Sequence, residues 1–205
     1  YFGKAGKEHW SFKAKAENRW GGKDAHDTTG LTQAQIDRLP KQSIESLQLK
    51  DQDKQNIMND LRIIKSENKK NLAVKAKIEK CISISLHIRR GDYVSNTAHG
   101  TCDLSYYSKA VKYFINLYGK NLEIFAFSDD PSWVKNNLKL PVNINFITHN
   151  YSDNNYEDLR LMSCCNHNII ANSSFSWWGA WLNKNPNKIV IAPMLWYANQ
   201  KIENR

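Results

Sequence analysis

The sequence lacks a long hydrophobic run. No apolar stretch in its 205 residues approaches the ~20 residues that a membrane-spanning helix needs. It also lacks a secretory leader and an initiating methionine, because Tyr1 opens directly on an aromatic and basic segment. We therefore expect a piece of a longer protein, located in the cytoplasm, with peripheral contact at the inner face of a membrane left open.

Metal-binding patterns are missing as well. The four cysteines (Cys81, Cys102, Cys164 and Cys165) form no CxxC pair, which argues against a zinc knuckle. Cys164 and Cys165 are adjacent in an apolar helical pattern and are expected to be reduced core residues. His, Asp and Glu residues do not cluster at metal-ligand spacing. We predict that the protein needs neither a metal nor a cofactor.

The net charge is strongly positive, at +9. A basic chain suits an anionic partner, such as nucleic acid, a membrane surface or a phosphorylated small molecule. The lysines are spread along the N-terminal half, as expected for solvated helix surfaces. Trp10, Phe12 and Trp20 are suited to stacking on bases, but no nucleic-acid-binding motif accompanies them. We therefore predict no nucleic-acid partner.

Residues 1–80 carry most of the charge and little of the aliphatic content. Residues 1–30 have no clear period and predict an irregular or partly helical segment. Residues 31–39 predict a short helix that stops at Pro40. Apolar residues at loose helical spacing predict one or two amphipathic helices within 43–79. We assign residues 1–80 to a mainly helical N-terminal segment.

From residue 81 onward, predicted strands and helices alternate strictly. Short connections between alternating elements imply a parallel sheet covered by helices on both faces. We therefore predict an α/β fold, with a Rossmann-like domain over residues 81–205. The predicted strands are 81–88, 122–127, 142–147, 167–171 and 188–192, and the predicted helices are 106–118, 133–138, 156–165 and 174–183.

Polar residues follow four of the predicted strands, where ligands bind to sheets of this kind. We expect these residues to converge on one edge of the sheet, because the carboxyl ends of parallel strands meet there. They are Arg89, Arg90 and Asp92, then Ser128, Asp129 and Asp130, then Thr148, His149 and Asn150, and finally Asn172, Ser173 and Ser174.

No glycine-rich phosphate loop is present, so a nucleotide on this sheet needs other groups to hold its phosphates. Arg89 can grip a diphosphate with two hydrogen bonds, although an ion pair with Asp92 also accounts for it. Ser173 and Ser174 precede a helix whose N–H groups attract an anion, or they simply cap that helix. His87 lies on the same side of its strand as Arg89, as a ligand contact or as a core residue.

Glu157 and Asp158 begin another predicted helix. Two acidic residues there are favourable to the helix dipole without any further role. Alternatively, one carboxylate accepts from the N1–H and the exocyclic amine of a guanine.

Five blocks of residues, in order, resemble the α-1,2-fucosyltransferases of glycosyltransferase family eleven. The sequence His-Ile-Arg-Arg-Gly-Asp-Tyr at 87–93 is similar to the HxRRxDY signature of that family. The remaining blocks are 104–110, 127–130, 157–163 and 172–182, and the resemblance covers about residues 45–197. One HxRR sequence is a weak signal, whereas five ordered blocks are a strong one.

The resemblance implies the C-terminal half of a GT-B glycosyltransferase that binds GDP-fucose without a metal. It implies inversion at the anomeric carbon of fucose and transfer to the 2-hydroxyl of a galactose-terminated acceptor in glycan or lipopolysaccharide synthesis. It also places Arg89 on the β-phosphate, Glu157 or Asp158 near the guanine, and Ser173 or Ser174 at the phosphates. We predict catalytic roles for Arg89 and Asp92. Substrate contacts are predicted for His87, Arg90, Ser128, Asp129, Glu157, Asp158, Asn172, Ser173 and Ser174.

Two departures from the family pattern leave alternatives open. The glycine-rich opening of the form GGLGNQ is absent, so residues 1–80 are expected to be a remnant of the acceptor domain or a link from it. The general base is not identified, because Asp92 is the nearest carboxylate in the motif but can instead orient Arg89. A second hypothesis is therefore a nucleotide- or glycan-binding module that is catalytically incomplete.

Overall fold

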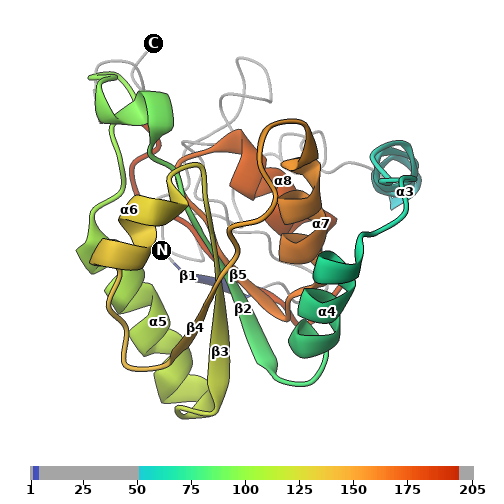
Figure 1. The fold of residues 1–205 in the computed structure, drawn as a ribbon, viewed down its shortest axis with the longest axis horizontal. Coiled ribbons are helices and arrows are strands. Elements are labelled where there is room, and N and C mark those ends of the chain that lie inside the picture. Colours follow the sequence, from blue (N-terminus) through green and yellow to red (C-terminus); the bar gives the residue numbers. More distant parts are fainter. Residues whose placement is uncertain (1, 5–50, 199–205) are drawn as a thin grey trace, which may run out of the picture. The chain divides into compact units, whose positions relative to one another are not determined.

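The computed structural model describes residues 2–4 and 51–198 (Figure 1). The predicted helix at 31–39 and the aromatic residues at 10, 12 and 20 lie outside the described residues. The strands are β1 (Phe2–Lys4), β2 (Ile82–Ile88), β3 (Leu122–Ser128), β4 (Asn143–Phe146), β5 (His167–Ile169) and β6 (Ile189–Ile191). The helices are α3 (Asp51–Asp60), α4 (Lys69–Ile78), α5 (Leu104–Tyr118), α6 (Pro131–Asn137), α7 (Tyr156–Cys164) and α8 (Ser174–Leu182), with 3-10 turns η2 (Gly91–Val94) and η3 (Ser152–Asn154).

The strands form one sheet in the order β1-β6-β5-β2-β3-β4. The strands β6, β5, β2, β3 and β4 are parallel, as predicted, and β1 is antiparallel to β6. From β2 the chain adds β3 and β4 on one side, then returns to place β5 on the other side of β2. The order therefore reverses between β2 and β5. This is the Rossmann-like arrangement, in which the reversal creates a crevice at the carboxyl ends of the two central strands.

The prediction for the start of the chain is wrong at Phe2–Lys4. These residues form a strand that pairs with Ile189–Ile191 at the edge of the sheet, where an irregular or partly helical segment was expected. Edge pairing uses backbone N–H and C=O groups, and three residues are too few to show a strand period in the sequence.

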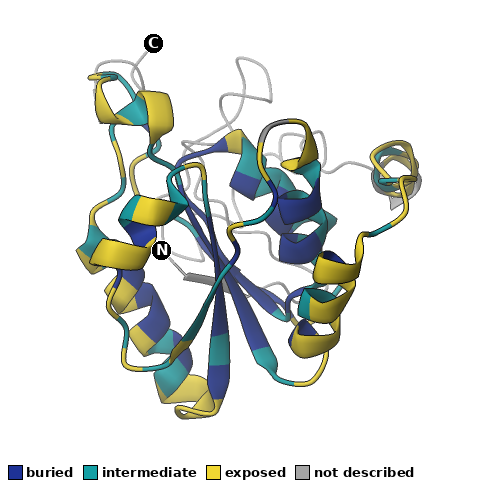
Figure 2. Ribbon diagram, in the orientation of Figure 1, coloured by how far each residue is buried: buried dark blue, intermediate teal, exposed yellow. Residues whose placement is uncertain are grey.

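Two hydrophobic clusters cover the two faces of the sheet. Figure 1 shows α5 and α6 on one side of the sheet and α4, α7 and α8 on the other. Alternate residues of β2 face opposite sides of the sheet, and Ile84, Leu86 and Ile88 belong to the cluster under α5 and α6. The second cluster contains Ile78 of α4, Phe125 and Phe127 of β3, and Leu161 and Met162 of α7. Figure 2 shows the same pattern, with buried strands and helices whose outer faces are exposed.

The chain divides into two compact units. Residues 65–198 and β1 belong to one of them, and α3 belongs to the other. Within the first unit α4 packs against α7, although α4 precedes residue 81, where we predict the Rossmann-like domain to begin. That predicted division of the chain remains a prediction. In the part of the chain that the structure describes, no helix is both long and apolar enough to cross a bilayer.

A buried histidine predicts how stability depends on pH. Nδ1 of His167 accepts a hydrogen bond from the N–H of Ile189 at 3.0 Å, so its ring must stay neutral there. Burial lowers the pKa of His167 from 6.5 to about 4. As the pH falls from 6.5 to about 4, the unfolded chain takes up the proton first and the native state loses stability.

We expect this loss to reach about 3 kcal/mol for His167 alone. The variant His167→Asn keeps an acceptor oxygen but does not titrate in this range. Urea unfolding at pH 7 and pH 4.5 checks the expectation, because the loss of stability should be smaller in the variant. An equal loss in both proteins would contradict it.

Candidate functional site

The edge of the sheet at the reversal brings two predicted segments together. Leu86 of β2 is in register with Ile169 of β5. Arg89 lies three residues after Leu86, and Asn172 lies three residues after Ile169. The first turn of α8, which begins at Ser174, therefore lies next to the end of β2. The prediction that these strand ends share one edge is confirmed.

Arg89 lies between two carboxylates at this edge. Its Nη1 is 2.8 Å from Oδ2 of Asp129, and its Nη2 forms an ion pair with Oδ1 of Asp92. The guanidinium also lies over the ring of Tyr93, with Cζ 5.0 Å from the ring centroid. Nε of Arg89 is buried and has no hydrogen-bond partner among the described residues. The side chain is 30% exposed, so it is open to a ligand.

Asp129 is fixed from two sides. Its Oδ1 accepts a hydrogen bond from the backbone N–H of Arg90 at 2.9 Å. Gly91 has φ +25°, and a Cβ atom at this residue would collide with the Asp129 carboxylate. The close approach of Asp129 to the backbone after β2 therefore requires glycine at position 91.

Arg90 points toward α6 rather than sharing the contacts of Arg89. Its Nε is 3.3 Å from Oδ2 of Asp130, and its Cζ lies 3.5 Å from the centroid of the Trp133 ring. Asp130 also caps α6 by accepting from the N–H of Trp133 at 3.1 Å. Ser128 accepts from the N–H of Asp130 at 3.0 Å, which fixes the turn after β3.

His87 faces the first turn of α8. Its ring centroid is 5.6 Å from that of Phe175, and burial, followed by the charge of Arg89, lowers the pKa of His87 to about 3. The imidazole is therefore neutral, and its Nδ1 is buried without a hydrogen-bond partner in the described part of the chain. Ser173, the N-cap residue of α8, makes no side-chain capping bond. An unpaired imidazole nitrogen and a helix N-terminus thus occupy one small region.

Asn172 holds two loops together beside this helix. Its Nδ2 lies 3.1 Å from the carbonyl oxygens of His99, Gly100 and Trp196. Its Oδ1 accepts from the thiol of Cys102 at 3.4 Å. The predicted substrate contact of Asn172 remains a prediction, while these bonds give the side chain a clear part in shaping the edge. Ser174, unlike Ser173 and Asn172, is exposed.

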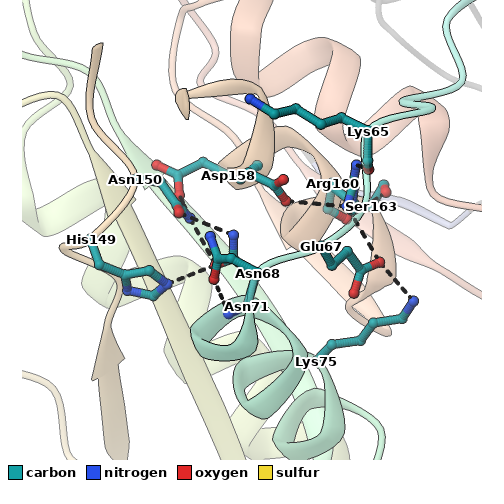
Figure 3. Close-up of polar contacts among 11 residues, drawn as sticks. Lys65, Glu67, Asn68, Asn71, Lys75, His149, Asn150, Asp158, Arg160 and Ser163 are labelled. Carbon is teal, nitrogen blue, oxygen red and sulfur yellow. Dashed lines mark hydrogen bonds and ion pairs between the residues drawn. The ribbon is translucent and has the colours of Figure 1, made fainter. Parts of the chain in front are cut away.

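A second group of buried polar side chains lies where α4, the loop after β4 and α7 meet (Figure 3). Asn71 and Asn150 exchange hydrogen bonds of 3.1 Å through their side-chain amides. Nε2 of His149 donates to Oδ1 of Asn71 at 2.7 Å, and Nδ2 of Asn150 donates to Oδ1 of Asp158 at 2.9 Å. Burial raises the pKa of Asp158 from 3.8 to about 7, against the effect of the Asn150 hydrogen bond. Such a carboxyl is poised to gain or lose a proton near neutral pH.

Glu157 belongs to a different set of contacts. Its Oε2 is 3.4 Å from Nη1 of Arg160, close enough for an ion pair but without hydrogen-bond geometry. The same Nη1 lies 3.6 Å from Glu67, which also pairs with Lys75 at 3.1 Å (Figure 3). Of the two predicted carboxylates, Asp158 is the one joined to the loop after β4.

The predictions missed the part played by α4. Asn71 is fully buried and is the central residue of the amide network. It stands three residues before Val74 and seven before Ile78, and both pack in the second cluster. A polar residue on the apolar face of a helix was therefore visible in the sequence, and such a residue needs a partner.

The described residues contain no group of three His, Cys, Asp or Glu side chains arranged to hold a metal ion. One Asp-x-Asp sequence, at 51–53, belongs to α3.

Comparison with known proteins identifies the family. The model of the family described as Glycosyl transferase family 11 matches residues 41–205. The O-antigen biosynthesis glycosyltransferase WbnK of Escherichia coli is 40% identical over 147 residues, which cover 70% of this chain and 45% of that protein. The alpha-1,2-colitosyltransferase of Escherichia coli is 41% identical over 130 residues, which cover 60% and 43% of the two chains. The chain spans less than half the length of both relatives. Because the family model matches most of the sequence, the chain belongs to glycosyl transferase family 11.

Proposed function

We propose that this chain binds a nucleoside diphosphate sugar, GDP-fucose, and supplies the donor half of an inverting fucosyltransferase. The observation that carries the proposal is the position of Arg89 at the carboxyl end of β2, next to β5, the strand whose chain continues into the N-terminus of α8. This is the place where the strand order reverses, and nucleotides bind there in sheets of this kind.

The diphosphate is assigned to the unpaired donors at this edge. Nε of Arg89 is buried and unpaired, and an arginine can bind two phosphate oxygens at once. The N–H groups of the first turn of α8 attract the same anion. His87, next to that turn, supplies either an acceptor or a donor at Nδ1. Arg89 thereby does the work that Mg²⁺ does in other transferases, and no metal is required.

The guanine is assigned to Asp158. An ionised carboxylate can accept from both N1–H and the exocyclic amine of guanine. Asp158 belongs to α7, and its bond to Asn150 joins it to the loop at the carboxyl end of β4. Glu157 is paired with Arg160, so it is the weaker candidate. The network of Asn71, Asn150 and His149 holds Asp158 in place from α4 and from the loop after β4.

The reaction is a single displacement. The 2-hydroxyl oxygen of a β-galactoside attacks the anomeric carbon of fucose, and the bond from that carbon to the β-phosphate oxygen breaks. Its electron pair leaves with GDP, whose charge Arg89 neutralises, and the hydroxyl proton passes to a general base. Asp92 is the proposed base, because it is an exposed carboxylate in contact with Arg89.

The names of the relatives bear on the finer assignment. One relative is named for O-antigen biosynthesis and the other for the alpha-1,2 transfer of colitose. They favour a role in building a surface polysaccharide and a linkage to a 2-hydroxyl. They also make nucleotide-linked colitose the competing donor.

Two measurements test the proposal. Isothermal titration with GDP, with and without EDTA, should show binding that the chelator does not change. A transfer assay with GDP-fucose and lactose, read by mass spectrometry, should show a fucosylated product. GDP binding without transfer would favour the binding module, and no GDP binding would refute the donor site.

A further inference from the structure

Arg89, Asp92 and Asp129 form an ion-pair triplet whose charges do not balance. One guanidinium faces two carboxylates, so the triplet holds an excess negative charge. An anionic diphosphate approaching Arg89 would be repelled unless one carboxylate leaves. The two carboxylates differ in how easily each can be displaced from Arg89.

Asp129 is the anchored member. Its side chain is 24% exposed, it accepts from the backbone N–H of Arg90, and the absence of a Cβ at Gly91 makes room for it. Asp92 is the loosely held member. Its side chain is 66% exposed, it stands on the short turn η2, and within residues 51–198 its carboxylate has Arg89 as its sole polar partner.

The guanidinium edges distinguish the two carboxylates further. Nε and Nη2 lie along one of the two edges of the planar group that can hold two oxygens side by side; the other edge is formed by Nη1 and Nη2. Asp92 occupies Nη2 on the first edge, and the neighbouring Nε is unpaired. Asp129 is on Nη1, which is not part of the first edge. A diphosphate that binds the first edge must displace Asp92 and can leave Asp129 in place.

We propose that Asp92 is a stand-in for the donor diphosphate on Arg89, and that Asp129 is a positioning residue that keeps Arg89 in place during the exchange. This inference rests on the proposed function. It makes donor binding the event that frees the Asp92 carboxylate, so the proposed base becomes available only after the donor is bound.

The test applies one chemical change to both carboxylates. In Asp92→Asn the carboxylate charge that competes with the diphosphate for Nη2 of Arg89 is removed. GDP should therefore bind about two- to fivefold more tightly, which corresponds to the free energy of an exposed ion pair. In Asp129→Asn one amide N–H must face a donor, whether from Arg89 or from the backbone of Arg90. Arg89 then loses its anchor, and GDP should bind about tenfold more weakly.

Titration calorimetry of the 205-residue chain with GDP, at one fixed ionic strength, gives both values. Circular dichroism melting verifies that each variant is folded, and Asp92→Ala repeats the first measurement with no side-chain oxygen left. Opposite shifts support the inference. Weaker or unchanged binding in both Asp92 variants, or shifts of the same sign for Asp92→Asn and Asp129→Asn, would overturn it. If the unchanged protein does not bind GDP, the proposed donor site itself fails.

Discussion

Replacing Arg89 with alanine is expected to lower fucosyl transfer by about 1,000-fold or more while the protein stays folded. The substitution removes the cation that neutralises the departing diphosphate, and loss of one preorganised donor alone costs about 100- to 1,000-fold in other enzymes. It also leaves Asp92 and Asp129 without the cation that pairs with them, so that both carboxylates repel the donor. GDP binding should weaken together with turnover.

Initial rates of transfer and GDP titrations measure both effects. Arg62→Ala is a suitable control, because it removes the same charge from an exposed residue whose side chain has no partner among the described residues. Arg89→Lys keeps the charge but loses the two-oxygen grip, so it should recover only a small part of the activity. Near-normal turnover in Arg89→Ala would exclude the proposed mechanism.

Replacing Asp158 with asparagine is expected to weaken GDP binding and to stabilise the protein at neutral pH. The amide places a donor where guanine also presents donors, which should weaken GDP by about 10- to 100-fold. The stability change has a separate cause. The native carboxyl holds its proton up to a pKa of about 7, whereas the ordinary value is 3.8.

The direction of the pH dependence follows from these two values. Between pH 3.8 and about 7 the native state is protonated and the unfolded state is ionised, so stability falls as the pH rises. The cost at pH 8 is up to about 4 kcal/mol. The asparagine side chain does not titrate and escapes this cost.

Thermal unfolding at pH 5 and pH 8 tests the expectation. The advantage of Asp158→Asn over the unchanged protein should be small at pH 5 and large at pH 8. Asp153→Asn makes the same chemical change at an exposed residue five positions earlier and serves as the matched control. A pH-independent difference would mean that Asp158 is ionised throughout. A stabilised variant that binds GDP normally would show that Asp158 does not contact the guanine.

The fold of the sheet unit was predictable because its elements are regular. Each strand from β2 to β6 and each helix from α5 to α8 lies within a few residues of its predicted range. Asp130 caps α6, and Pro131 is its first residue. Strict alternation and short connections leave few topologies for such a chain. Strand β1 was missed because edge pairing leaves no pattern in three residues.

The candidate site was predictable in its location but not in its connections. The rule that ligands bind at strand ends placed Arg89, Asp129 and Ser173 at one edge. Sequence alone could not show that Asp129 binds Arg89, because the two residues are 40 positions apart and meet through the pairing of β2 with β3. The bond of Asn150 to Asn71 in turn depends on how α4 packs against α7. The sequence shows that Asn71 needs a partner, but not which residue provides it.

The short strand β1 has a consequence for any shortened form of this protein. Without residues 2–4, the outer edge of β6 loses the backbone partners that β1 gives it. That edge is Ile-Val-Ile, an apolar, β-branched segment with no charge to discourage pairing with a neighbouring molecule. A truncated chain would thus carry a template for intermolecular strand addition.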